Sequence, residues 1–307
     1  PMAARLETFL PAQPADESWR IVDGEQTLAA CSLWWRTTPS LDGVRSGLIG
    51  HYETTDDRAA GRLLAYACAR LSEQGCAVAI GPMDGSTWHS YRFVTERGTE
   101  PAFFLEPQNP DEWPAQFQRA GFAPLAHYVS ALDAGLELRD ERAPSIEAQL
   151  RASGVTIRPI DAGRFEDEVR GIFAVSLDSF ARNLLYQPIG EAEFLEMYRP
   201  LARYVDPRLS FVAQRDGRMV GFVFTLPDWS ARPGTPKAVI VKTLARLGDG
   251  AYRGLGVALL ERSRRAAHEA GFARGIHALM HDANPSTRLS ARFGAIMRGY
   301  TLFSKAL

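Results

Sequence analysis

The order of predicted elements repeats along this chain of 307 residues. In each half, an apolar strand precedes a helix with apolar residues on one face, and a glycine ends that helix before the next strand. A second helix, a second glycine and a last strand complete each copy. The expected elements are 45–53, 58–74, 77–80, 111–120 and 122–132 in the first half, and 238–245, 254–270, 275–280, 285–293 and 295–303 in the second. Such a repeat predicts two copies of one α/β (α+β) unit.

The two copies differ in what precedes them. The second has additional predicted elements, which are a strand at 155–160, helices near 162–176 and 190–203, and a hairpin at 209–226. The first has only a short segment followed by a hairpin at 20–35. We therefore expect one domain over 1–137, a linker over 138–153 and a second domain over 154–307, a division that suits a chain of this length.

Composition excludes several classes of function. The 35 basic and 36 acidic side chains give a net charge of −1, without a long basic run, so nucleic acid is not an expected partner. Three cysteines without a CxxC pair argue against a disulfide framework and a zinc site. No apolar run is long enough for a membrane span, and no signal peptide is recognisable. We expect a cytoplasmic protein with no membrane contact and no metal; composition leaves the oligomeric state open.

One segment, Tyr252–Ala258, carries the clearest chemical signal, because it follows an apolar strand and opens an amphipathic helix. A helix N-terminus presents unpaired N–H groups and the positive end of the helix dipole. The small residues Gly254 and Gly256 leave room for a diphosphate to approach the backbone, and Arg253 adds a positive charge.

Three other interpretations of this segment were weighed. A Rossmann fingerprint needs a third glycine where Leu259 stands, and the Walker sequence is absent. A plain tight turn between a strand and a helix stays open, although it explains one glycine better than an arginine with several small residues.

The pattern Arg253-x-x-Gly256-x-Ala258 resembles the [QR]-x-x-G-x-[GA] motif of the GCN5-related N-acetyltransferases. Asn284 after the next strand, and the segment 292–294 before the last strand, are similar to the family's second motif and its closing segment. The resemblance covers about residues 155–305.

The resemblance implies a fold and a reaction. Each domain is expected to hold a mixed, mostly antiparallel sheet with a splayed pair of parallel strands, flanked by helices. Acetyl-CoA would be the co-substrate, with its pantetheine arm between strands 238–245 and 275–280, and its acetyl group would pass to a primary amine of a small acceptor by direct attack. The implied cofactor-binding residues are Thr243, Leu244, Ala245, Arg253, Gly254, Leu255, Gly256, Val257, Ala258 and Asn284. Asn284 could instead only cap the helix that begins at Pro285.

The first half resembles the family more weakly. Its segment 58–63 keeps the arginine and one glycine, but Arg62 and Leu63 stand where small residues belong. Bulky side chains there would crowd a diphosphate, so the first copy is predicted to be degenerate and not to bind acetyl-CoA productively.

The catalytic groups are less clearly indicated. Ser290 occupies the position where the family often has a tyrosine acid, so Tyr300 is the candidate acid, unless it is a core residue. His281 is the candidate base, with His277 and Asp228 as alternatives. Transfer of another acyl group, or binding of an acyl-CoA without catalysis, stays open.

A second cluster, Gly81–Arg92, mixes turn-forming, polar and aromatic residues. We expect this loop to help shape an acceptor pocket between the domains, or to be a packed loop with Trp88 at their interface. A hydrolytic triad from its serine, histidine and aspartate is not supported, because the loop has no nucleophile elbow.

Overall fold

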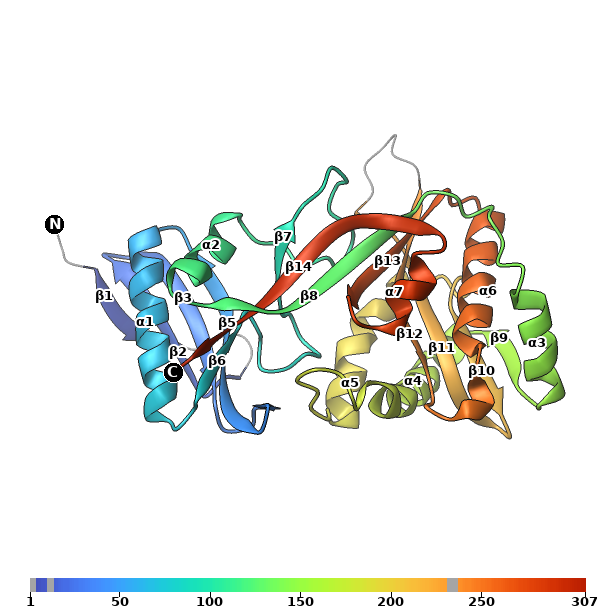
Figure 1. Ribbon diagram of the computed structural model, residues 1–307, viewed down its shortest axis with the longest axis horizontal. Helices are drawn as coiled ribbons and strands as arrows, with labels where there is room; N and C mark the ends of the chain where they lie inside the picture. The colour runs from blue at the N-terminus through green and yellow to red at the C-terminus, as the bar shows by residue number, and fades with distance from the viewer. Residues whose placement is uncertain (1–3, 10–13, 231–236) are drawn as a thin grey trace.

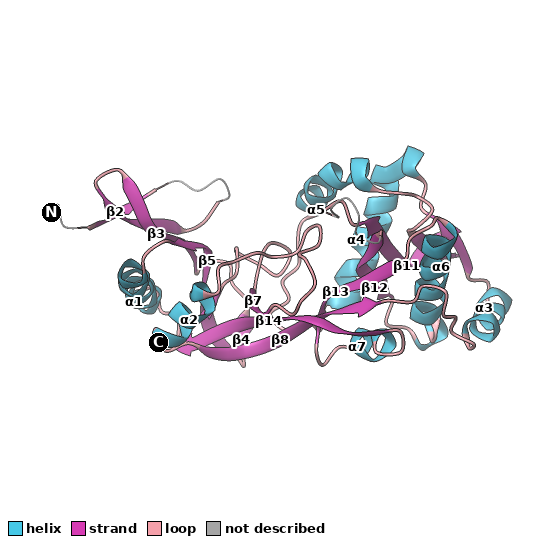
Figure 2. Cartoon of the chain, turned by 90° about the horizontal axis from the view of Figure 1, so that it is seen from above, coloured by secondary structure: helices cyan, strands magenta, loops and turns pink. Residues whose placement is uncertain are grey.

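The computed structural model describes residues 4–9, 14–230 and 237–307. One long mixed sheet runs through both halves, and the helices pack on it (Figures 1 and 2). Its strand order is β1-β2-β3-β5-β6-β14-β8-β13-β12-β11-β10-β9, with β4 and β7 attached to β5 and β14. The predicted α/β class with a large mixed sheet is confirmed.

The strands and helices occupy the following ranges. The strands are β1 Arg5–Thr8, β2 Glu17–Asp23, β3 Gln26–Trp34, β4 Ser40–Leu41, β5 Val44–Thr54, β6 Val78–Gly81, β7 Phe93–Glu96, β8 Ala123–Asp133, β9 Thr156–Pro159, β10 Phe211–Arg215, β11 Arg218–Pro227, β12 Ala238–Arg246, β13 Arg274–His281 and β14 Gly294–Ala306. The α-helices are α1 Asp57–Glu73, α2 Glu112–Arg119, α3 Ala143–Ala152, α4 Phe165–Phe180, α5 Glu191–Tyr198, α6 Leu255–Glu269 and α7 Pro285–Ser290.

The last strands of the two halves are exchanged. The C-terminal strand β14 pairs with β6 of the first half, and β8 of the first half pairs with β13 of the second. The two exchanged strands also pair with each other along most of their length, as Figure 1 shows. Both strands were predicted, but the exchange was not, so each half completes its sheet with a strand of the other.

A buried ion pair holds the exchanged strand β8 in place. Arg264 on α6 donates from Nε to Asp133 at the end of β8, over 2.6 Å, and neither side chain is more than 1% exposed. The same guanidinium donates to the backbone oxygens of Gly135 and Leu138. Removing one partner would leave an uncompensated buried charge, which typically destabilises by about 3–5 kcal/mol.

The predicted linker, 138–153, contains helix α3, which packs against α6. Its Ile146 lies so close to Gly254 that a side chain at Gly254 would approach it to 2.8 Å. Gly254 also has φ +85°, which favours glycine. The segment before the second half therefore supports the start of α6.

The parallel strands β12 and β13 diverge part of the way along. They pair from Ala238 and Arg274 as far as Val241 and His277, and no further pair joins them within the described residues. Just beyond, the β11–β12 register shifts and leaves Lys242 without a partner, and β13 gains one residue relative to β8 after His277. Because a β-bulge bends its strand, these irregularities open a gap between the two strands.

Candidate functional site

The start of α6 has unpaired backbone donors. Gly254 is the N-cap residue and supplies no capping side chain, while the N–H groups of Val257 and Ala258 both reach its carbonyl oxygen. Within the described residues, no acceptor contacts the N–H groups of Leu255 and Gly256. Unpaired donors at the positive end of a helix form an anion-binding site.

The space in front of these donors is open. A Cβ atom added at Gly256 would meet only the Leu244 side chain, at 3.8 Å. Arg253, which directly precedes the N-cap residue Gly254, is exposed. The local geometry therefore fits a diphosphate, with room at Gly256 and an exposed arginine directly before the cap residue.

The strand residues named in the prediction line the gap. On one edge, Thr243, Leu244 and Ala245 pair with β11, while their other edge has lost its β13 partner. Leu244 is half-buried, and Phe293 is a half-buried member of the same apolar cluster. The gap thus offers backbone groups along β12 and an apolar wall, as an extended ligand arm requires.

Asn284 caps α7. Its side-chain oxygen accepts the N–H of Ser286 over 3.1 Å, and Pro285 follows at the first helical position. The capping interpretation is confirmed, and contact with a pantetheine arm stays a prediction.

His281 lies at the open end of β13, where its ring packs edge-on against Tyr128. Its Nδ1 accepts the N–H of Ala283 over 3.1 Å, so the neutral ring carries its hydrogen on Nε2. Asp282 lies 3.4 Å from the same Nδ1, but that nitrogen is already engaged as an acceptor. In this tautomer Nε2 of His281 can donate a hydrogen bond, and Nδ1 is not free to accept a proton.

Tyr300 is fully buried on β14. Its hydroxyl donates to Glu106 over 2.5 Å and accepts from Ser130, whose oxygen accepts the N–H of Leu279 in the bulged part of β13. Burial, together with the bond to Glu106, raises the pKa of Tyr300. The core interpretation of this residue is confirmed, and its hydrogen points away from the gap toward a carboxylate.

The other two candidate groups are also engaged. His277, the last residue of β13 that pairs with β12, contacts Ser290 through Nδ1 over 2.7 Å, and burial lowers the pKa of His277 to about 4. It is therefore neutral near pH 7. Asp228 accepts the N–H groups of Phe104 and Ser230, which gives it a structural role.

The Gly81–Arg92 loop joins the two halves. Trp88 donates its indole N–H to the carbonyl oxygen of Gln187 over 2.7 Å and packs on Phe180 and Phe194 of the second half. The prediction of a packed loop with Trp88 at the interface is confirmed. The sequence predicts no role for Arg92. The one feature that distinguishes Arg92 in the sequence is its positive charge in a loop of aromatic and small residues.

The described part of the chain holds no group of three or more His, Cys, Asp or Glu side chains placed to bind a metal ion. Across these residues, none of the helices has the length and apolar character that crossing a membrane requires.

Comparisons with known proteins show which fold this architecture resembles. No family model matches the sequence. A bacterial ceramide synthase from Caulobacter vibrioides is 26% identical over 199 residues, which cover 62% of this chain and 50% of the relative, so the match spans about half the length of that curated protein.

Solved structures match nearly the whole chain. A GCN5-related N-acetyltransferase from Sphaerobacter thermophilus superposes with a TM-score of 0.52 at 13% identity, over 94% of this chain and 80% of that one. A tandem protein of the same fold from the clavulanic acid biosynthesis pathway gives 0.51 at 14% identity, over 100% and 84%. At such identities a match shows the fold alone. The chain therefore has the fold of the GCN5-related N-acetyltransferases, in a tandem arrangement of two copies.

Proposed function

We propose that this protein transfers an acyl group, with acetyl as the first choice, from a CoA thioester to a primary amine of a small acceptor. The observation that carries the proposal is the pair of unpaired N–H groups at Leu255 and Gly256, next to the gap between β12 and β13. In this arrangement the helix start holds the diphosphate, and the edge of β12 at 243–245 holds the pantetheine arm. The first copy contributes structure and does not hold the donor.

The transfer needs few groups from the protein. The neutral amine bonds to the thioester carbonyl carbon, its nitrogen then gives up a proton to water, the C–S bond breaks, and the thiolate takes a proton from water. His281 is the proposed hydrogen-bond donor to the departing sulfur, because its Nε2 carries the hydrogen and has no partner within the described residues. Tyr300 is a weaker choice, since its hydrogen is bonded to Glu106. Bringing the amine and the thioester together supplies much of the remaining rate enhancement.

A second candidate function is transfer of a longer acyl chain. A ceramide is the amide of a fatty acid, and a relative matched by sequence has that word in its name. This likeness favours testing long-chain donors.

The diphosphate test separates the proposal from its alternatives. We expect acetyl-CoA to bind at least 100-fold more tightly than S-acetylpantetheine, which lacks the diphosphate, because charge-assisted bonds to the helix start would be lost. Calorimetric titration measures both affinities. Equal affinities would contradict the site.

The reaction test follows. Release of free thiol in the presence of an amine panel, with acetyl- and palmitoyl-CoA compared, identifies the donor, and mass spectrometry identifies the acylated amine. Tight binding of acetyl-CoA without transfer to any amine would instead support a non-catalytic binding protein.

A further inference from the structure

Arg92 is a buried cation at the junction of the two halves. It ends the Gly81–Arg92 loop, and only 8% of its surface is exposed. Its backbone has φ +71°, a conformation that residues other than glycine rarely adopt. The fold therefore holds this arginine in an unusual conformation and largely out of water.

The partners of its guanidinium are neutral. The group stacks on the rings of Tyr91 and Tyr128, at 4.0 and 4.3 Å from their centroids. Nη1 donates to the Tyr91 hydroxyl over 2.9 Å and lies 3.5 Å from the Leu279 oxygen. Nε is buried without a hydrogen-bond partner in the described part of the chain.

No carboxylate neutralises this charge. Among the described residues, no Asp or Glu oxygen lies within 4 Å of the Arg92 nitrogens. Asp282, which follows β13 directly, is more than half exposed and lies next to His281 instead. A desolvated cation is stable only when charge and hydrogen bonds compensate it, and ring contacts supply only part of that. An anion is the partner that Arg92 lacks.

The position of Arg92 ties it to the proposed reaction. Leu279, whose oxygen it approaches, lies in the bulged segment of β13 beyond the last pair with β12. Tyr128 also contacts His281, the proposed hydrogen-bond donor, edge-on. The site is built from both halves, with the loop and β8 coming from the first and β13 from the second.

The geometry points to Arg92 as the residue that binds an anionic group of the acceptor. The acceptor would then be an amine that also carries a carboxylate or a phosphate, because the planar guanidinium fork recognises both. The two tyrosine rings flank the fork, and its Nε and Nη2 have no hydrogen-bond partner among the described residues, with Nη2 not among the buried atoms. This inference rests on the proposed function and specifies its acceptor class.

Matched acceptors test the inference. Acyl transfer from acetyl-CoA is compared for amino acids against their amides, and for phosphoethanolamine against ethanolamine. We expect kcat/KM to be at least tenfold higher for the anionic member of one series, and which series shows it distinguishes carboxylate from phosphate. In Arg92→Met this preference falls at least tenfold, mainly through KM, and in Arg92→Lys part of it returns. The control Arg97→Met, which removes an arginine that is 42% exposed and paired with Asp111, keeps the preference.

Two results would overturn the inference without contradicting the proposed function. A wild-type protein that shows no preference for anionic acceptors, or an Arg92→Met variant that slows both members of a pair equally while its unfolding midpoint is unchanged, overturns the inference. If no amine is acylated at all, the same pairs are compared by their effect on the unfolding midpoint. Stabilisation by the anionic member in the wild type and its loss in Arg92→Met then supports the anion site, and no stabilisation overturns it.

Discussion

The two copies of the fold begin their long helices in different ways. At the start of α1, Asp56 accepts the N–H of Ala59 over 2.6 Å, and Asp57 adds a second carboxylate in the first turn. At the start of α6, Gly254 has no side chain to cap the helix. The first copy thus fills with its own carboxylates the position where the second leaves donors open for an anion.

The side-chain packing behind the two helix starts also differs between the copies. In the first copy, the fully packed Tyr52 meets the rings of Phe93, Trp113 and Phe117 edge-on, and its hydroxyl donates to Gln116 over 2.8 Å. The corresponding wall of the second copy is formed by half-buried apolar residues such as Leu244. The first copy therefore has closely packed aromatic rings behind its helix start, whereas the second has half-buried aliphatic side chains there.

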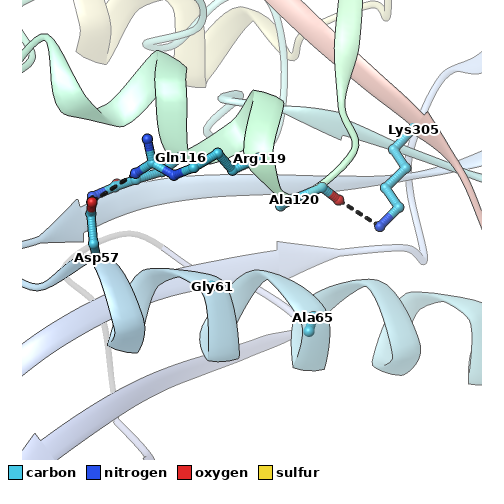
Figure 3. A pocket seen from close by; sticks show the side chains of 7 residues that line it. All are labelled: Asp57, Gly61, Ala65, Gln116, Arg119, Ala120 and Lys305. Atoms are coloured by element: carbon cyan, nitrogen blue, oxygen red, sulfur yellow. Dashed lines mark hydrogen bonds and ion pairs between the residues drawn. The ribbon is translucent and has the colours of Figure 1, made fainter.

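A cavity remains in the first copy, but charged pairs cross it. It measures about 280 Å³ and lies between α1 and α2, where Arg119 and Gln116 both reach Asp57 (Figure 3). Lys305 of the exchanged strand β14 donates to the carbonyl oxygen of Ala120 at its other end. The comparison indicates that the first copy has kept the fold while its polar groups satisfy one another.

The strand exchange determines how this comparison can be tested. Because β8 and β14 complete each other's sheets, isolating one half removes a strand from its core. Point substitutions at matching positions of the intact chain avoid that problem.

The largest effect is expected at the matching glycines. Gly256→Glu places a carboxylate among the unpaired donors and repels a diphosphate, so acetyl-CoA affinity should fall at least 1,000-fold, about 4 kcal/mol. Calorimetric titration measures the loss. Gly61→Glu, at the glycine that the sequence motif aligns with Gly256 but that lies further inside α1, meets open space and should leave the affinity unchanged. A folded Gly256→Glu variant with normal affinity would contradict the assignment of the donor site.

Tyr52 of the first copy and Leu244 of the second should contribute differently to the free energy of unfolding. Tyr52→Ala empties a packed aromatic site and should lower the free energy of unfolding by about 3–5 kcal/mol. Leu244→Ala removes a half-buried side chain and should lower it by about 1–2 kcal/mol, while weakening acetyl-CoA binding. Urea denaturation compares the two. Equal losses of stability would mean that the second gap is as tightly packed as the first.

Much of this architecture follows from local sequence, and the exchange does not. Helix α6 was expected over 254–270 and spans Leu255–Glu269, because Gly254 and Gly271 both adopt positive φ and delimit it. Alternating apolar residues predict β8 and β14 as strands, but periodicity shows which face is buried and not which distant strand pairs with it. Arg92 was missed for the same reason, since its burial depends on Tyr128 from another strand.

The two pairs of parallel strands end their pairing at different residues. This difference predicts that pH affects the stability of the second half more than that of the first. His277 ends the β12–β13 pairing, and Ile80 ends the β5–β6 pairing. Burial lowers the pKa of His277 to about 4, so the unfolded chain binds the proton more readily between pH 4 and 6.5. Acidification from pH 7 to 4 should therefore destabilise the fold through this group by about 2–3 kcal/mol.

Substitution isolates that contribution. His277→Ile with Ser290→Ala copies the apolar first half and removes the hydroxyl that would lose its partner. Its acid destabilisation should be smaller than that of the wild type by the same 2–3 kcal/mol, measured by urea denaturation at pH 7 and 4. The exposed His268→Gln variant serves as control. Parallel pH profiles for the double variant and the wild type would show that His277 does not titrate abnormally.

The smallest effects concern the two helix caps. Asp56→Ala and Asn284→Ala each remove an acceptor for a backbone N–H and should each lower the free energy of unfolding by about 1 kcal/mol. Only the second is expected to weaken acetyl-CoA binding, because the family resemblance puts Asn284 beside the pantetheine arm. Thermal unfolding and titration on the same samples give both quantities.

Asn284→Ser separates the two roles of this residue. Serine caps a helix about as well as asparagine, so stability should be retained, but the side-chain amide that would reach the arm is gone. Weaker acetyl-CoA binding at unchanged stability would identify Asn284 as a ligand contact. Full affinity in Asn284→Ser, together with lost stability in Asn284→Ala, would reduce Asn284 to the role that Asp56 has in the first copy.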